Sequence, residues 1–304
     1  SMRNAGVEID LGVDIIRTPD ILWSFSVNGT HYENKLTSLP PGVGSPELGG
    51  GYEAGVQNTA NIYLRGVDRP YYNIYIAKYA GVDQKTGLAM LYHTVDQADH
   101  TNGRWSDQAL GTVVTTTDGS LATRYEVGDA TADFVGGFST SFTYKNLDFS
   151  ATFAYQIGGY FFSREFAYGG FSDQGIGDVY GTCWMDAWTP TNRGSNYPMR
   201  MVGGTNYGVM YGNKLFTDMS LFDASYLSVK NLTLGYNLPQ RLMEKWKMGG
   251  IRVYVSLDNM WLISACKGMD PRLINENVGD GGTMVDPYTY PAMRSASLGI
   301  NVTF

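Results

Sequence analysis

The sequence is poor in the residue types that most catalytic and metal sites need. Its 304 residues include three histidines and two cysteines, and charged side chains make up 17% of the chain. Cys183 and Cys266 lie far apart in connecting segments, so their spacing matches no zinc motif. A disulfide between them and two reduced thiols both stay open. We expect no metal site and no cofactor.

The sequence also lacks long hydrophobic runs and basic clusters. Mean hydropathy is −0.20, and no segment approaches the ~20 apolar residues of a membrane helix, which excludes helical insertion. Net charge is −7, and without clustered Lys and Arg we expect no nucleic-acid partner. No secretory signal follows Ser1. This predicts a signal cleaved from a longer precursor, or a fragment.

Aromatic residues, in contrast, are abundant. They make up 13% of the chain, with 22 tyrosines. Such usage is typical of the aromatic girdles of outer-membrane barrels. It is equally compatible with an aromatic-rich soluble β-protein, so the strand pattern has to decide between them.

Apolar and polar residues alternate with a period of two along most of the chain. In residues 295–304 and 7–15 every second side chain is apolar, which predicts strands with one apolar and one polar face. Further strands are expected in residues 23–30, 134–144, 149–157, 225–238 and 251–263. Strands of about ten residues are long enough to cross a bilayer when tilted.

Within residues 225–238 the apolar set changes phase. This predicts a β-bulge near Lys230 and Asn231, and Pro239 is expected to end the strand. Aromatic side chains on the apolar faces are expected to meet lipid or its interface, namely Trp23, Phe142, Tyr236 and Trp261.

The connectors have two lengths that alternate along the chain, as in barrels with short periplasmic turns and long extracellular loops. The short ones are residues 18–20, 145–148 and 239–250, and the long ones are residues 35–60, 160–222 and 265–291. Residues 61–67 and 71–79 supply two further candidate strands, giving about nine in all. An odd number of strands with two free edges cannot close into a barrel by itself, so the edge strands need partner strands from elsewhere.

Several stretches resemble the C-terminal third of SusC/RagA-type TonB-dependent outer-membrane transporters. The most specific is residues 224–239 (ASYLSVKNLTLGYNLP). The others, in the same order as in that family, are residues 2–9 (MRNAGVEI), 79–87 (YAGVDQKTG), 187–192 (AWTPTN), 258–259 (DN), 269–271 (MDP) and 299–304 (GINVTF). The resemblance covers essentially the whole chain.

This resemblance implies an all-β fold, an antiparallel up-and-down transmembrane β-barrel, of which residues 1–304 would form a C-terminal part. The complete barrel would have about 22 strands, and the plug domain and earlier strands would lie upstream, absent from this chain. The implied function is nutrient import across the outer membrane, of oligosaccharides or peptides. The implied partners are a SusD-like surface lipoprotein, the TonB complex and outer-membrane lipid.

No catalytic residue is expected. Glu8, Asp10 and Asp14 share a strand face and could suggest a glycosidase pair, but a solvated lumen wall explains them better, together with Arg252 and Asp258. His93 and His100 are interpreted as scattered surface histidines. No Gly-x-Ser-x-Gly elbow is present. Acidic residues after Asp270 could hold calcium, although a solvated loop is favoured.

Substrate contact is assigned to aromatic residues of the longest connector, because flat rings pack against sugars and peptide side chains. These candidates are Trp184, Trp188, Tyr197, Tyr207 and Tyr211. Two alternatives remain, a soluble carbohydrate-binding β-sandwich, whose apolar rows would face each other, and a secreted β-rich glycosidase. Unequal connectors and the terminal aromatic residue disfavour both.

Overall fold

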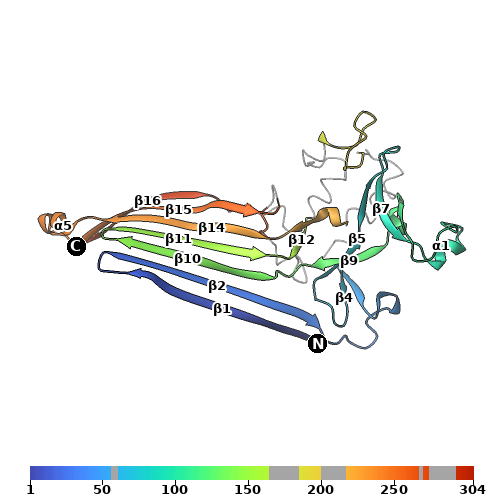
Figure 1. Ribbon diagram of the computed structural model, residues 1–304, viewed down its shortest axis with the longest axis horizontal. Coiled ribbons are helices and arrows are strands. Elements are labelled where there is room, and N and C mark those ends of the chain that lie inside the picture. The colour runs from blue at the N-terminus through green and yellow to red at the C-terminus, as the bar shows by residue number, and fades with distance from the viewer. Residues whose placement is uncertain (56–60, 164–184, 200–216, 267–269, 274–291) are drawn as a thin grey trace.

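The computed structural model describes residues 1–55, 61–163, 185–199, 217–266, 270–273 and 292–304. Its main body is a seven-stranded antiparallel sheet whose strands follow one another in chain order (Figure 1). These strands are β1 (Met2–Arg17), β2 (Ile21–Leu36), β10 (Phe134–Tyr144), β11 (Leu147–Ile157), β14 (Tyr226–Asn237), β15 (Gly250–Ser264) and β16 (Ser295–Thr303). This confirms the predicted antiparallel up-and-down fold, as an open, partial barrel.

The register separates polar from apolar side chains across the whole sheet. One row of paired residues is polar in every strand, namely Asp14, Ser24, Ser141, Ser150, Thr233, Ser256 and Ser297. An adjacent row is apolar in every strand, namely Ile16, Trp23, Phe142, Phe149, Leu234, Val255 and Leu298. Because neighbouring positions in a strand point to opposite faces, one face is hydroxyl-rich and the other is apolar.

The apolar face is not packed into a core. Leu11 is 61% exposed, Leu234 50% and Leu298 74%. Phe153 stacks on Phe138 of the neighbouring strand, with ring centroids 4.4 Å apart. The β-sandwich alternative required these side chains to be buried against one another, so the structure disagrees with it.

The predicted bulge in β14 is confirmed. Thr152 and Phe153 are consecutive in β11, but they pair with Asn231 and Val229 of β14. This leaves Lys230 as the extra residue of the bulge. A second bulge, which was not predicted, falls at Ile15, because Asp14 pairs with Ser24 and Ile16 with Trp23. It shifts Ile16 into the apolar row.

The prediction of about nine spanning strands is wrong for the described residues, because the two extra candidates lie outside the main sheet. They form β4 (Asn61–Arg65) and β5 (Asn73–Ala77), five residues each, in a separate sheet. Such strands are too short to cross a bilayer. Consecutive side chains of both are buried, which is the pattern of a core strand with both faces covered.

A head formed by the described parts of the long connectors contains most of the buried apolar side chains among the described residues. Ile62, Ile74, Ile76, Leu91 and Val95 are each at most 2% exposed. One head sheet contains β3 (Tyr52–Gly55), β4, β5 and β9 (Arg124–Asp129), and the other contains β6 (Tyr79–Val82), β7 (Ala89–Thr94) and β8 (Val113–Thr116). Shorter elements are η1 (Pro46–Leu48), α1 (Gln97–Thr101), η2 (Gly119–Leu121), η3 (Asp218–Ser220), and the pair β12 (Tyr160–Phe162) and β13 (Leu221–Asp223).

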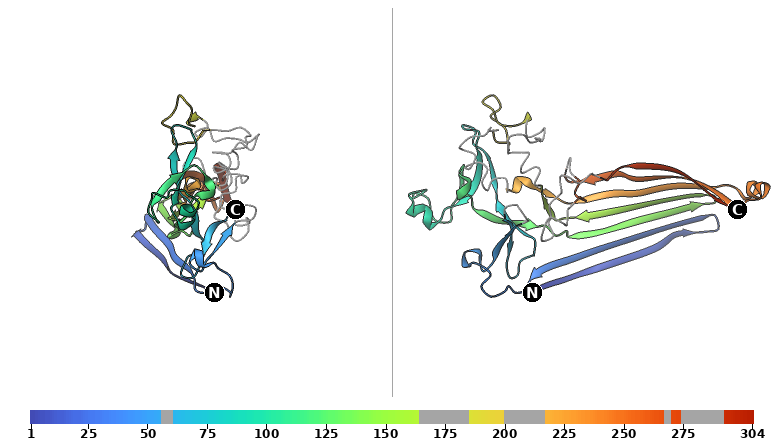
Figure 2. Two further views of the ribbon diagram at one scale, coloured as in Figure 1. Left: turned by 90° about the vertical axis from the view of Figure 1, so that its right-hand side faces the viewer. Right: turned by 180° about the vertical axis from the view of Figure 1, so that it is seen from behind.

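Short and long connectors lie at opposite ends of the main sheet, as predicted (Figure 2). The head and the N-terminus lie at one end, and the C-terminus lies at the other beside α5 (Gln240–Trp246). The β10–β11 turn is shorter than predicted, because β11 begins at Leu147 and Lys145 takes the left-handed conformation (φ 52°). No helix among the described residues has the length and apolar character needed to cross a membrane.

Candidate functional site

Two neighbouring register rows on the hydroxyl-rich face form a surface that we term the polar wall. The first is the polar row that starts at Asp14. The second contains Gly12, Ser26, Ser139, Thr152, Asn231, Asp258 and Ser295. Side-chain hydrogen bonds run across these rows between different strands. The wall therefore presents small polar groups whose orientation is set by their neighbours.

The hydrogen bonds of the polar wall are short and specific. Ser24 Oγ donates to Asp14 Oδ1 at 2.7 Å. Asn231 Nδ2 donates to Asp258 Oδ1 at 2.6 Å and to Ser256 Oγ at 2.8 Å. Carboxylates therefore serve as hydrogen-bond acceptors within a network of hydroxyl and amide groups.

Glu8 and Asp10 occupy the same face of β1 as Asp14, opposite Thr30 and Asn28 of β2. Both are exposed. The sequence prediction of a shared face is therefore correct, whereas their contact with a water-filled lumen stays a prediction.

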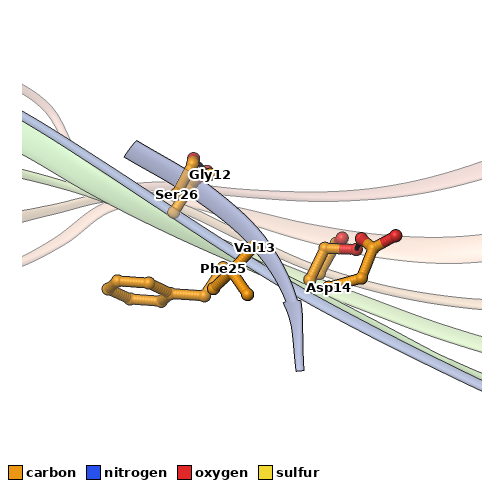
Figure 3. Close-up of a pocket in the computed structure, with 8 residues that line it drawn as sticks. Gly12, Val13, Asp14, Phe25 and Ser26 are labelled. Carbon is orange, nitrogen blue, oxygen red and sulfur yellow. Dashed lines mark hydrogen bonds between the residues drawn. The ribbon is translucent and has the colours of Figure 1, made fainter. Parts of the chain in front are cut away.

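A hollow of about 380 Å³ lies where β1, β2 and β10 meet. Figure 3 labels Asp14 and Ser26 from the polar face and Val13 and Phe25 from the apolar face. Ser26 and Ser139 hydroxyls contact each other at 2.8 Å across the strands that line it. The hollow is a shallow part of the wall whose polar groups are hydroxyls and one carboxylate, and its lining includes no His, Cys or Lys.

Near the short connectors, an ion pair spans the polar face over a glycine. Arg252 donates through Nε to Asp148 Oδ1 at 3.0 Å and through Nη2 to Oδ2, and its guanidinium lies 4.9 Å from the Tyr254 ring centroid. Gly235 lies between their strands, and a Cβ there would come within 2.6 Å of the Asp148 carboxylate. Arg252, predicted to line the lumen, is thus held by Asp148 and Tyr254.

At the other end of the polar face, a cavity of about 430 Å³ lies between the sheet and the head. We term it the rim pocket; its lining residues are Asn4, Ala5, Gly6, Tyr32, Asn34, Tyr72 and Thr131. Asn34 donates through Nδ2 to Asn4 Oδ1 at 2.6 Å, and its Oδ1 accepts the Tyr71 N–H at 3.1 Å. Gly6 pairs with Tyr32, which is 42% exposed. Aromatic rings beside amides suit a polar ligand with flat apolar faces.

Sequence reasoning missed the rim pocket. The alternation in residues 7–15 and 23–30, if extended toward Asn4 and Asn34, could have placed Asn4, Gly6, Tyr32 and Asn34 on one face. Tyr72, however, comes from the connector between β4 and β5, and nothing local in the sequence brings it to that face.

Only part of the predicted aromatic substrate set lies in the described residues. Trp184, Tyr207 and Tyr211 lie outside them. Trp188 is 8% exposed, and a Cβ on Gly87 would come within 2.4 Å of its ring. The backbone N–H of Trp188 donates to the backbone carbonyl of Tyr197 at 2.9 Å, so the two residues are neighbours. Contact of either ring with a substrate stays a prediction.

The interpretation of His93 as a surface histidine is wrong. His93 is 6% exposed, and its Nε2 lies 2.6 Å from Asp99 Oδ2, where Asp99 is 2% exposed. Asp99 also accepts the Asp96 N–H at 3.0 Å and Arg104 Nε at 3.2 Å. These hydrogen bonds, the Asp96 N–H foremost and then His93 and Arg104, lower the pKa of Asp99 to about 2 against the cost of burial. Asp99 stands at the N3 position of α1 in a capping box, a signal that the sequence did contain.

At the start of the acidic loop after β15, Asp270 forms an ion pair with Arg272. Asp270 accepts Arg272 Nη2 at 2.6 Å and Nε at 2.8 Å. Burial opposes ionisation of Asp270, but the Arg272 bonds outweigh it and lower its pKa. The described part of the chain contains no group of three His, Cys, Asp or Glu residues placed to hold a metal. Cys266 is buried, and Cys183 lies outside the described residues.

Comparison with curated proteins gives relatives over the whole length of the chain. TonB-dependent receptor P3 of Formosa agariphila is 28% identical over 316 residues, and TonB-dependent receptor SusC of Bacteroides thetaiotaomicron is 26% identical over 309. Each alignment covers 100% of this chain but only 29% and 26% of those proteins. No protein-family model matches the chain.

Solved structures agree with the sequence relatives. The RagAB peptide transporter superposes with a TM-score of 0.73 at 28% identity, covering 100% of this chain and 29% of that one. The RagAB peptide importer in its closed-closed state gives 0.72 at 27% identity, with 30% of that chain covered. The chain is therefore similar throughout to SusC/RagA-type TonB-dependent receptors, which confirms the resemblance seen in its sequence. These relatives are receptors and transporters, not enzymes, as expected for this chain.

Proposed function

We propose that this chain, similar throughout to outer-membrane TonB-dependent receptors, is the C-terminal barrel portion of such a receptor in the cell outer membrane. The observation that carries this proposal is the pair of register rows, one polar and one apolar in all seven strands. The coverage of 29% of the relatives' length supports a plug domain and further strands elsewhere in the complete protein.

In this proposal the apolar face meets lipid. Its strands have nine to 16 residues, enough to cross the hydrocarbon region when tilted. Transfer of a half-exposed Leu or Val side chain from water to hydrocarbon is favourable by about 1 kcal/mol. Repeated over several such rows, this term favours membrane insertion of the face over exposure to water.

The opposite face lines the import path. Glu8, Asp10, Asp14, Arg252 and Asp258 line a water-filled lumen together with the hydroxyl groups of the polar wall. Small hydroxyls bind a passing solute weakly and at many points, so that it is neither excluded nor retained. The chain supplies binding and passage, and no covalent step is involved.

The proposed cargo is an oligosaccharide or a peptide. The rim pocket supports this with Tyr32, Tyr72 and two Asn amides at the head end of the lumen face. Trp184, Trp188, Tyr197, Tyr207 and Tyr211 remain candidate contacts in the longest connector. A SusD-like surface lipoprotein on the head side and the TonB complex, acting through the plug, are the proposed partners.

Uptake by cells that carry the complete receptor tests the proposal. The double variant Ser26→Trp and Ser139→Trp places two large side chains on the lumen face and narrows the passage. We expect its uptake of labelled oligosaccharide to fall at least about tenfold, and labelled peptide is measured in parallel. The matched control, Val27→Trp, lies on the apolar face and leaves uptake within about twofold. Equal uptake by all three proteins, present at equal levels in the outer membrane, would contradict import along this face.

A further inference from the structure

The helix α5 connects β14 to β15 at the end of the sheet opposite the head (Figure 1). It follows Pro239 and ends at Lys247, whose left-handed conformation (φ 54°) lets its N–H bond the Glu244 carbonyl. The sequence prediction for this segment was only a short connector. A turn between antiparallel strands needs as few as two residues, so the helix is an addition that requires its own explanation.

The helix buries one apolar side chain and exposes two others. Met243 is 4% exposed, whereas Leu242 is 39% and Trp246 48% exposed. Leu242 and Trp246 are four residues apart and therefore share one helix face. Phe304, 94% exposed, is adjacent in the fold, because Gly249 N–H donates to the Thr303 carbonyl at 2.7 Å. The end of the sheet thus carries exposed aromatic residues that no core requires.

The charged residues of the same segment are mostly basic. Arg241, Lys245 and Lys247 stand against one carboxylate, Glu244. All four are exposed, and the ion pairs of the described residues include none of them. A protein with net charge −7 therefore concentrates unneutralised positive charge beside exposed Leu and Trp.

This combination is that of a helix lying in a membrane interface. Trp side chains concentrate at the boundary between hydrocarbon and headgroups, and Lys and Arg beside them reach to lipid phosphates. The apolar row of β14, which includes Leu234, runs through Tyr236 directly toward the helix. The helix therefore begins three residues after the end of a strand whose apolar face is proposed to meet lipid.

We propose that α5 is an interfacial anchor that binds anionic phospholipid on the short-connector side of the membrane. Trp246 and Leu242 enter the boundary of the acyl region, and Arg241, Lys245 and Lys247 contact lipid phosphates. This rests on the proposed function, because it requires the main sheet to span the bilayer.

Tryptophan quenching by brominated lipids tests the anchor. The complete receptor is inserted into phosphatidylcholine vesicles containing about 30% phosphatidylglycerol, with bromines placed either shallow or deep in the acyl chains. The emission of Trp246 is the difference between the receptor and its Trp246→Phe variant. We expect shallow bromines to quench it at least about twofold more than deep ones.

Two matched variants separate this proposal from the proposed function. The difference for Trp261→Phe reports on the apolar face of β15, and that for Trp105→Phe reports on the head. Quenching of Trp261 without quenching of Trp246 would overturn the anchor and leave the barrel proposal standing. Quenching of neither Trp246 nor Trp261 would contradict both the anchor and the barrel proposal.

A charge variant tests the lipid preference. In the unaltered receptor we expect Trp246 quenching to be about twofold or more greater in vesicles with phosphatidylglycerol than in phosphatidylcholine alone. The combined replacement Arg241→Gln, Lys245→Gln and Lys247→Gln should remove this increase. Glu244→Gln is the control and should preserve that increase. Equal Trp246 quenching in charged and neutral vesicles by the unaltered receptor would overturn the assignment of anionic lipid.

Discussion

Gly136 shows how a single residue sets the spacing of two barrel strands. A Cβ at this position would come within 2.2 Å of the Asn28 carbonyl oxygen and 2.8 Å of the Tyr155 hydroxyl. Gly29 faces it across the ladder, and Tyr155 lies over both glycines with its hydroxyl donating to the Asn28 carbonyl at 3.1 Å. The missing side chains therefore let a tyrosine lie flat over two strands.

We predict that Gly136→Ala destabilises the chain by about 1–3 kcal/mol, because backbone atoms of β2 must move to admit the methyl group. Unfolding by urea in detergent micelles measures the change. Gly12→Ala is the control, since no atom lies within 4 Å of a Cβ there. Equal losses for the two variants would contradict the explanation.

Asp99 gives the head a dependence on pH. Its pKa in the folded state is about 2, below the ordinary 3.8, chiefly because of the Asp96 N–H and the bonds from His93 and Arg104. A carboxyl group with a lowered pKa stabilises the fold above its unfolded pKa, and the stabilisation is lost as pH falls toward the folded value. We therefore predict that head stability declines between pH 4 and pH 2.

The fluorescence of Trp105 measures this decline, since its ring lies 4.8 Å from that of His93. In the Asp99→Asn variant the head should be less stable at neutral pH, and the loss of its remaining stability between pH 4 and pH 2 should be smaller than in the unaltered protein. Asp107→Asn is the control, because Asp107 only accepts the Gln108 side-chain amide. An unchanged pH profile in Asp99→Asn would rule out this carboxyl as the cause.

At the scale of elements, each long strand has one apolar and one polar face, and we propose that the first meets lipid and the second meets water. We predict that Leu234→Arg destabilises the inserted chain by about 2 kcal/mol, because the charge is placed in hydrocarbon. Thr233→Arg, the adjacent residue on the polar wall, should cost less than half as much. Denaturant unfolding from vesicles measures both, and a larger cost for Thr233→Arg would contradict the assignment of faces.

The long strands could be predicted from sequence because each has one polar face, which produces a period of two. The bulge at Lys230 was visible for the same reason, as a change of phase. The strands β4 and β5 have both faces buried and lose that alternation, so residues 61–67 and 71–79 were mistaken for membrane strands. The helix α5 is too short for its periodicity to stand out between Pro239 and Gly249.

At the scale of the molecule, candidate site residues come together from distant segments, and this limits what sequence can predict. The hydroxyl-rich face could be anticipated strand by strand, as for Glu8, Asp10 and Asp14. The rim pocket could not, because Tyr72 and Thr131 belong to head connectors. The His93–Asp99 pair was also missed, since burial of both side chains depends on how the head folds.

The main sheet has two edges, β1 and β16, each with one strand neighbour among the described residues. Amides on the outer side of β1 therefore have no strand partner among the residues that the structure describes. We predict that β1 amides exchange with solvent at least about tenfold faster than those of β11 in the isolated chain, and that this difference disappears in the complete receptor. Equal exchange in the isolated chain would show that the edge is covered in another way.

We propose that one face of the sheet meets lipid and that the other meets water. Val255→Cys and Ser256→Cys, adjacent in β15 and on opposite faces, test it most directly when Cys183 and Cys266 are replaced by Ser. In outer membranes that contain the complete receptor, a water-soluble maleimide should label Ser256→Cys at least about tenfold faster than Val255→Cys. Equal labelling, or faster labelling of Val255→Cys, would contradict the account.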